Sequence, residues 1–149
     1  MKRDERKVFM ARTLQMFHDQ RRRARKKSRQ GEIDYTLEML RGAARQALGI
    51  MPDDPAFAGV KPEAFCRYCR MTLVAGNFSG DHELPIGRGG SFSWKNLDLD
   101  VCQGCNKAKG RLTAPEFRKL IELAEAMDPA AKRDILARLK AGSSCIARG

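Results

Sequence analysis

The sequence predicts an α+β protein with a small, loop-rich centre and helices on both sides of it. Three observations lead to this class. The segments that flank the centre have helix-compatible composition or helix-capping signals. The centre, residues 66–110, contains eight glycines and prolines between two short candidate strands, 71–74 and 81–84. Four of the five cysteines lie in the same centre as two Cys-x2-Cys pairs, which indicates that a zinc ion stabilises it.

Length and charge restrict the possible functions. A chain of 149 residues normally makes one domain, or one small domain with helical attachments, which excludes a two-domain enzyme with a large cofactor fold. The 29 Lys and Arg against 18 Asp and Glu give a net charge of +11, which predicts an acidic partner. No apolar run reaches the roughly 20 residues that cross a bilayer, and the N-terminus lacks the apolar core of a signal peptide. We therefore expect no membrane association and a cytoplasmic, reducing compartment.

Residues 1–31 are expected to form a basic helical arm. Residues 1–29 contain twelve Lys and Arg against three Asp and Glu, and they contain no Gly or Pro, which favours a charged helix ending near Gly31. Such a like-charge block favours the phosphates of DNA or RNA, with a solvated tail or an anionic membrane surface as alternatives. Its densest part consists of Arg21, Arg22, Arg23, Arg25, Lys26, Lys27 and Arg29.

Residues 32–62 are expected to form one helix and a linker. Apolar residues recur near helical spacing between Asp34 and Leu48, and Gly49 is a stop signal. Residues 51–61 are rich in Pro and Gly, which predicts an extended linker.

Residues 113–149 are expected to form two helices that pack on the rest of the chain. Thr113 and Glu116 make a capping box for a helix that continues to about Met127. Asp128 and Pro129 then begin a second helix. Its expected apolar face and C-terminal stop are Ile135, Leu136, Leu139 and Gly142.

Residues 63–112 are the expected core, because they contain the paired cysteines. The two knuckles stand 32 residues apart and consist of Cys66, Cys69, Cys102 and Cys105. In a reducing compartment this spacing is typical of a tetrahedral four-thiolate zinc site, whereas disulfides or ordinary buried thiols are the alternative. Four thiolates leave no open coordination position, so the Zn2+ is expected to be structural. Cys145 is expected to be a free thiol without a role.

A second pattern lies between and just after the knuckles: Asp81-His82, Pro85, Gly89-Gly90, Asn96-Leu97, and Cys105-Asn106 followed by Lys109. Over about 45 residues, 66–110, this order closely resembles the HNH endonuclease family. The resemblance implies a ββα-metal fold, in which a two-stranded ribbon bears His82, a loop contains Asn96 and a short helix carries Asn106. It also implies that the bond cut is a DNA phosphodiester.

The residue types suit phosphodiester hydrolysis. His82 is the candidate general base, since an imidazole titrates near neutrality. The resemblance implies that Asp81 ligates a catalytic divalent ion, and Asn106 would add a second ligand through its amide oxygen. A carboxylate and an amide oxygen suit Mg2+ or Mn2+. Asn96 is expected to hold the loop beneath the base and to orient His82.

The strand geometry sets one condition on this site. Neighbouring side chains of an ideal strand point to opposite faces, so Asp81 and His82 reach one site only if the strand twists or bulges there. Phe92 and Trp94 are expected to pack the small core rather than stack on a base. Three cations near the expected site are candidate phosphate contacts, with ordinary solvated charges as the alternative: Arg88, Lys107 and Lys109.

Two other functions stay open. One is a zinc-ribbon-like module that binds nucleic acid without cutting it. The other is an adaptor whose helices recruit a protein partner in a phage or mobile-element assembly. Binding alone does not require Asp81, His82 and Asn106 together, so the sequence favours a metal-dependent DNA endonuclease with structural Zn2+ and catalytic Mg2+ or Mn2+.

Overall fold

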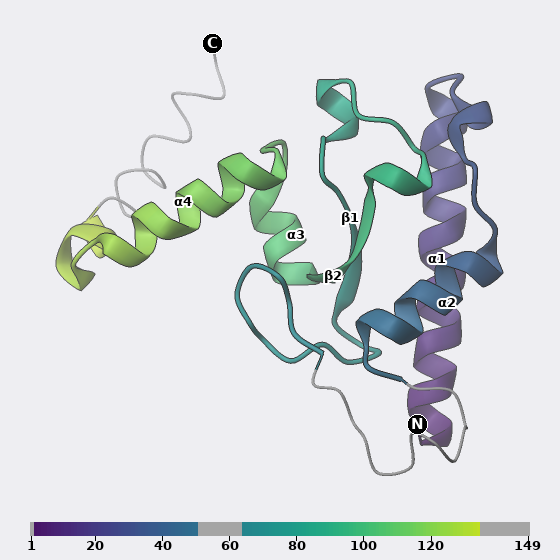
Figure 1. Cartoon of the computed structure of the whole chain (residues 1–149), viewed down its shortest axis with the longest axis horizontal. Helices are drawn as coiled ribbons and strands as arrows, with labels where there is room; N and C mark the ends of the chain where they lie inside the picture. The colour runs from purple at the N-terminus through teal and green to yellow at the C-terminus, as the bar shows by residue number, and fades with distance from the viewer. Residues whose placement is uncertain (1, 51–63, 135–149) are drawn as a thin grey trace. The chain divides into compact units, whose positions relative to one another are not determined.

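A computed structural model describes residues 2–50 and 64–134. The chain has two compact units, residues 1–114 and 115–149. The described residues of the first unit form three helices and two strands, which confirms the α+β class (Figure 1). These elements are α1 (Arg3–Lys26), α2 (Leu37–Ala47), β1 (Phe78–His82), β2 (Leu97–Cys102) and α3 (Gln103–Lys109), with short 3-10 turns η1 (Gln30–Glu32), η3 (Ile86–Arg88) and η4 (Trp94–Asn96).

Local signals explain the ends of the first two helices. α1 has acidic residues in its first turn and basic residues in its last turn, an arrangement that the helix dipole favours. α2 begins after Thr36, whose hydroxyl accepts a hydrogen bond from the Met39 N–H at 3.2 Å. Gly49 follows α2 with φ 60°, a left-handed conformation that glycine adopts at little cost. Both predicted helices are confirmed, and the predicted linker 51–61 lies outside the described residues.

One face of α1 is buried in the first unit. Phe9 and Phe78 are both 0% exposed and stack with ring centroids 6.1 Å apart. The Arg12 guanidinium donates a hydrogen bond to the Phe78 carbonyl at 2.6 Å. Near the other end of the helix, Ala24 packs in a cluster with Ile86 and Phe92. The sequence predicts an arm outside the catalytic core, but these contacts make α1 part of the packed unit.

β1 and β2 form an antiparallel pair in which His82 faces Leu97. β2 has the sequence LDLDVC, and its apolar residues Leu97, Leu99 and Val101 are buried, as alternation on a half-buried strand requires. This strand is missing from the sequence-based expectation, although its alternation is a sufficient signal.

Of the two predicted strands, one is not formed and the other is β1. The one expected at residues 71–74 is wrong, because that segment contributes only a single bridge between Phe65 and Thr72. The one expected at 81–84 exists as β1, but it begins three residues earlier, at Phe78.

The strand pairing is irregular close to the Asp-His pair of the sequence pattern. Ser79 faces Val101 while Asp81 faces Asp98, so two steps along β1 correspond to three along β2. An extra residue of this kind bends the strand and increases its twist. The irregularity therefore lies directly before Asp81 and His82. This is where a twist or bulge is needed if both side chains are to reach one site.

The second unit contains most of α4 (Ala114–Ala126), which begins where the capping signal predicted. The Asp128 carboxylate accepts hydrogen bonds from the N–H groups of Ala130 and Ala131 at 2.9 and 3.1 Å, which starts the predicted second helix at residues 129–134. Its later positions lie outside the described residues, as does Cys145. Leu120 and Leu123 are exposed, so the expected packing role is not seen for them. None of the described helices is long and apolar enough to span a bilayer.

Candidate functional site

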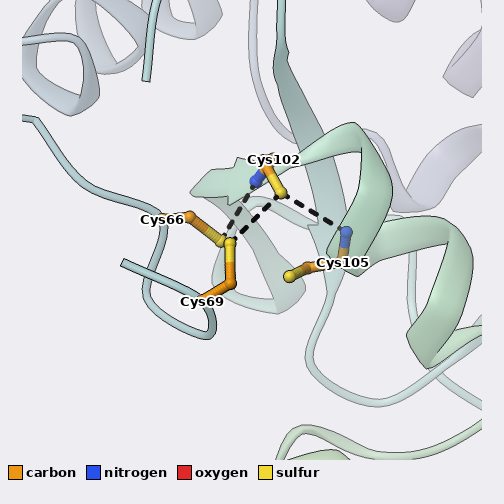
Figure 2. Close-up of side chains that lie close together, drawn as sticks. All are labelled: Cys66, Cys69, Cys102 and Cys105. Atoms are coloured by element: carbon orange, nitrogen blue, oxygen red, sulfur yellow. Dashed lines mark hydrogen bonds between the residues drawn. The ribbon is translucent and has the colours of Figure 1, made fainter. Parts of the chain in front are cut away.

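The four paired cysteines come together where β2 ends and α3 begins. Their Sγ atoms all lie within 4.8 Å of one another, and Figure 2 shows the four side chains gathered around one point. The Sγ atoms of Cys69 and Cys102 are 3.7 Å apart. Four Zn–S bonds of about 2.3 Å in a tetrahedron would place the sulfurs about 3.8 Å apart, whereas a disulfide needs about 2.05 Å. The cluster could therefore hold a metal ion such as zinc.

Backbone N–H groups support the sulfurs of this cluster. Cys66 Sγ accepts a hydrogen bond from the Cys102 N–H at 3.3 Å, and Cys102 Sγ accepts one from the Cys105 N–H at 3.4 Å (Figure 2). Burial raises the pKa of the Cys66 thiol, but backbone hydrogen bonds outweigh it and lower the pKa to about 7. Burial raises the pKa of Cys69 and Cys105. A bound cation would favour the thiolate form of all four.

Asp81 is buried on β1, and each of its carboxylate oxygens has a protein partner. Oδ1 accepts a hydrogen bond from the Lys109 ammonium at 2.9 Å, and Oδ2 accepts one from the Tyr68 hydroxyl at 3.2 Å. Lys109 also donates to the His82 carbonyl at 2.7 Å. The carboxylate is therefore held from two sides, by α3 and by the knuckle that contains Tyr68.

Asn106 lies on α3 directly after the last cysteine. Its amide nitrogen donates to the Ser79 hydroxyl at 2.7 Å and to the Gly80 carbonyl at 2.9 Å. Both bonds use the nitrogen, which leaves the amide oxygen as the atom suited to a cation. These bonds attach α3 to β1 directly before Asp81. The two candidate ligands, Asp81 on β1 and Asn106 on α3, therefore lie on two elements that contact each other. Their donor set, a carboxylate and an amide oxygen, fits a hard divalent ion.

His82 is buried next to Asp81, with 7% of its surface exposed. Its ring meets the edge of Phe92 at a centroid distance of 6.0 Å. Burial, followed by the positive charges of Arg23 and Lys109, lowers the pKa of His82 to about 4. The imidazole is therefore neutral at physiological pH, which is the form that accepts a proton.

Asn96 fastens the loop between the two strands. Its amide nitrogen donates to the carbonyls of Leu84 and Ser91 at 2.9 and 2.8 Å, and its oxygen accepts from the Leu84 N–H at 2.9 Å. Gly90 sits inside this arrangement, and a Cβ there would lie 1.8 Å from the Leu84 carbonyl oxygen, so only glycine fits. These contacts hold the loop that contains Phe92, which in turn touches His82.

The predicted phosphate contacts fall into two groups. Six cations of the basic block, together with Arg88 and Lys107, have exposed side chains: Arg21, Arg22, Arg23, Arg25, Lys26 and Lys27. Arg29 is half-buried, stacks on the Phe92 ring at 5.6 Å and donates to the Gly90 carbonyl at 3.0 Å. Lys109 is 2% exposed. Its ammonium binds the Asp81 carboxylate and the His82 backbone carbonyl inside the protein, which does not favour the predicted role of Lys109 as a phosphate contact.

Two residues of the first knuckle are absent from the sequence-based site, namely Arg67 and Tyr68, and Tyr68 bonds to Asp81. Arg67 forms ion pairs with Asp98, Asp100 and Glu83. Burial raises the pKa of Asp98 to about 6, although Arg67 opposes the shift. Arg67 and Tyr68 lie between Cys66 and Cys69. Their position inside this Cys-x2-Cys pair is the one sequence signal that could have indicated a place near the site.

Comparison with known proteins identifies the central segment. Residues 66–121 match the sequence model of a family described as HNH endonuclease. No curated protein and no solved structure matches the chain. The matched residues include the cysteine cluster, β1, β2 and α3, which are the elements that carry Asp81, His82 and Asn106. Residues 66–121 are therefore similar to the HNH endonuclease family, and this similarity indicates nuclease activity in general and a nucleic acid as substrate.

Proposed function

We propose that the protein is a metal-dependent DNA endonuclease in which His82 activates water to attack a phosphodiester bond. The observation that carries this proposal is the joint attachment of Asp81, His82 and Asn106 to one small framework of β1 and α3. Asn106 bonds to the residue before Asp81, and Lys109 bonds to the Asp81 carboxylate and to the backbone carbonyl of His82. A module that only bound nucleic acid would not need this combination of base and ion ligands.

His82 would take a proton from the attacking water. Its lowered pKa keeps the imidazole neutral, which is the form that can take up a proton, and also makes the ring a weaker base than an ordinary histidine. Contact with Phe92 limits the positions of the ring. Asn96 would act through the loop rather than through the reacting atoms, since its hydrogen bonds go to Leu84 and Ser91.

Asp81 and Asn106 would hold the catalytic divalent ion, Mg2+ or Mn2+. When bound, this ion supplies Lewis acidity that stabilises negative charge on the phosphate and on the departing oxygen. The chain contributes the carboxylate of Asp81 and the amide oxygen of Asn106 at fixed places. The four cysteines would hold a separate structural Zn2+ that takes no part in the chemistry.

The exposed face of α1 would bind the DNA backbone close to this centre. Ala24 packs with Phe92, and Phe92 touches His82, so the basic end of α1 lies near the candidate base. Exposed Lys and Arg side chains neutralise phosphates and release counterions. DNA held on this face would therefore pass close to His82.

Substitution of His82 tests the mechanism. We expect the purified protein to nick or linearise supercoiled plasmid with Mg2+ or Mn2+ but not with EDTA, and to leave 5′-phosphate ends. His82→Ala should lower the cleavage rate by about 100-fold or more, the usual contribution of a general base. Its zinc content and circular dichroism should match those of the unsubstituted protein.

His18→Ala is the matched control, because His18 is the other histidine of the chain and is exposed on α1. This variant should cut at the normal rate. Equal cleavage by His82→Ala would contradict the mechanism. DNA binding without cleavage by the unsubstituted protein would favour the non-catalytic binding module, and cleavage only with an added protein would favour the adaptor.

A further inference from the structure

Lys109 lies inside the candidate active site and not on its surface. The side chains of Lys109 and Asp81 are 1% and 4% exposed, and the ammonium is 2.9 Å from Asp81 Oδ1. It also donates to the His82 carbonyl at 2.7 Å. A lysine is almost never buried so completely unless its charge is paired. The ion pair with Asp81 therefore explains how the fold tolerates this buried lysine.

The position of Lys109 is fixed by the helix that presents Asn106. The two residues are three positions apart on α3, so they share one face of the helix. Asn106 bonds to Ser79 and Gly80, and Lys109 bonds to the next two residues of β1. The ammonium is thus a built-in component of the site, unlike a surface lysine that can move into solvent.

From this geometry, and resting on the proposed role of Asp81 as an ion ligand, we infer that Lys109 is the resident counter-ion of Asp81 and weakens divalent-ion binding there. Without a divalent ion, the ammonium balances the buried carboxylate, so folding does not require the ion. When an ion shares the carboxylate, two positive charges face each other at short range. In a poorly hydrated interior their repulsion is strong, and it lowers the affinity for the ion.

This arrangement distinguishes the two metal sites of the proposed enzyme. Neutral backbone N–H groups support the sulfurs of the cysteine cluster. A lysine supports Asp81 instead. We therefore expect the cysteine site to retain its ion through purification and the Asp81 site to exchange its ion freely with solution.

Lys109→Met tests the inference without measuring cleavage. In zinc-loaded protein, Mn2+ affinity is measured by the electron paramagnetic resonance signal of free Mn2+, and thermal unfolding is recorded with Mn2+ and in chelator-free buffer without Mn2+. We expect Lys109→Met to bind Mn2+ about tenfold more tightly, because the repelling charge is gone. Without Mn2+, its melting temperature should be lower than that of the unsubstituted protein, because the buried carboxylate is unpaired. Mn2+ should raise the melting temperature of the variant more than that of the unsubstituted protein.

Lys107→Met is the matched control, because Lys107 is an exposed lysine on the same helix. This variant loses the same charge and should keep the original Mn2+ affinity within about twofold. If Lys109→Met does not fold, Lys109→Gln replaces it, since glutamine can still donate hydrogen bonds but has no charge. Equal or weaker Mn2+ binding by the Lys109 variant that folds would overturn the inference. An absence of Mn2+ binding in all proteins would instead overturn the ion-ligand role of Asp81, and the inference with it.

Discussion

His82 is surrounded by features that disfavour a positive charge on its ring. Burial is the largest of them, and the charges of Arg23 and Lys109 add to it, so that the pKa falls to about 4. Arg23 stands on α1 and Lys109 on α3, far from His82 in sequence. The electrostatic environment of the candidate base is therefore produced by two elements that the chain folds around it.

This environment predicts an unusual pH dependence of cleavage. The rate should depend on neutral His82 and should fall only when the pH drops toward the lowered pKa, well below the ordinary value of about 6.5. Arg23→Gln removes one positive charge, which should raise the pKa of His82. The acid limb of the pH–rate profile, where the rate falls as the pH drops, should then move to higher pH. The measurement is kcat at saturating DNA between about pH 3.5 and pH 8, a range that includes the lowered pKa.

Arg22→Gln serves as the control for this comparison. Arg22 is also exposed on α1, but it pairs with Asp19 and is not among the causes of the His82 shift. Its acid limb should coincide with that of the unsubstituted protein. Coincident limbs for the Arg22 and Arg23 variants would contradict an effect of Arg23 on the base.

At the scale of elements, α1 has two faces with different tasks. Phe9, Thr13, Gln20 and Ala24 are buried along one face. The cations of the basic block lie on the exposed surface of the same helix. The helix therefore stabilises the core and provides the candidate DNA-binding surface at once.

Two changes to α1 should separate these tasks. Replacing five exposed cations with glutamine should leave the protein folded, weaken DNA binding and reduce the dependence of log Kd on log salt by about 0.9 for each phosphate that is no longer neutralised. The five are Arg21, Arg22, Arg25, Lys26 and Lys27. Deleting residues 1–29 should instead expose Phe78 and abolish cooperative thermal unfolding, because Phe9 no longer covers it. A deletion variant that melts cooperatively and cuts DNA would contradict this assignment.

The elements can be predicted from the sequence where the signal is local. Gly49 ends one helix and Asp128 begins another through local backbone conformation and contacts, and these two predicted helix ends are confirmed. β2 is not among the predicted strands because its first residue belongs to the expected Asn96 loop, although its alternation is present. The packing of Phe9 on Phe78 could not be predicted, because periodicity identifies a buried face but not the residue that covers it.

In the site, too, features set by neighbouring residues can be predicted from the sequence, whereas contacts between distant segments cannot. The cysteine cluster can be predicted from the sequence, because two Cys-x2-Cys pairs are typical of a site in which four thiolates bind one metal ion. The roles of Asp81, His82 and Asn106 stay predictions. The position of Lys109 is visible in the motif, but its burial is not, since that depends on how α3 lies against β1. Tyr68 has no sequence signal for its contact with Asp81.

At the scale of the whole molecule, the cysteine cluster connects both halves of the candidate site. The first knuckle contains Tyr68, which bonds to Asp81. The second knuckle begins α3, which carries Asn106 and Lys109. An ion that joins the two knuckles would therefore also fix the groups that hold Asp81 from its two sides.

Removal of the ion from the cysteines should consequently disable the whole unit. A structural zinc of this kind contributes on the order of 10 kcal/mol to folding. We expect chelator-treated protein to lose its thermal transition and its cleavage activity, and Mg2+ alone not to restore them. Zn2+ followed by Mg2+ should restore both, as measured by unfolding and plasmid cleavage. Full activity with Mg2+ in protein that atomic absorption shows to be free of zinc would contradict this coupling.

The uneven strand pairing has a consequence for reading related sequences. Between Ser79 and Asp81, β1 advances by two residues while β2 advances by three. The orientation of the Asp81 and His82 side chains therefore depends on the number of residues in β2 as well as on their types. A relative that lacked one residue between the positions of Asn96 and Cys102 would keep every ligand and the base, yet lose the twist that orients them. If the proposed roles of Asp81 and His82 hold, we expect the length of this interval to distinguish relatives that cut DNA from inactive ones.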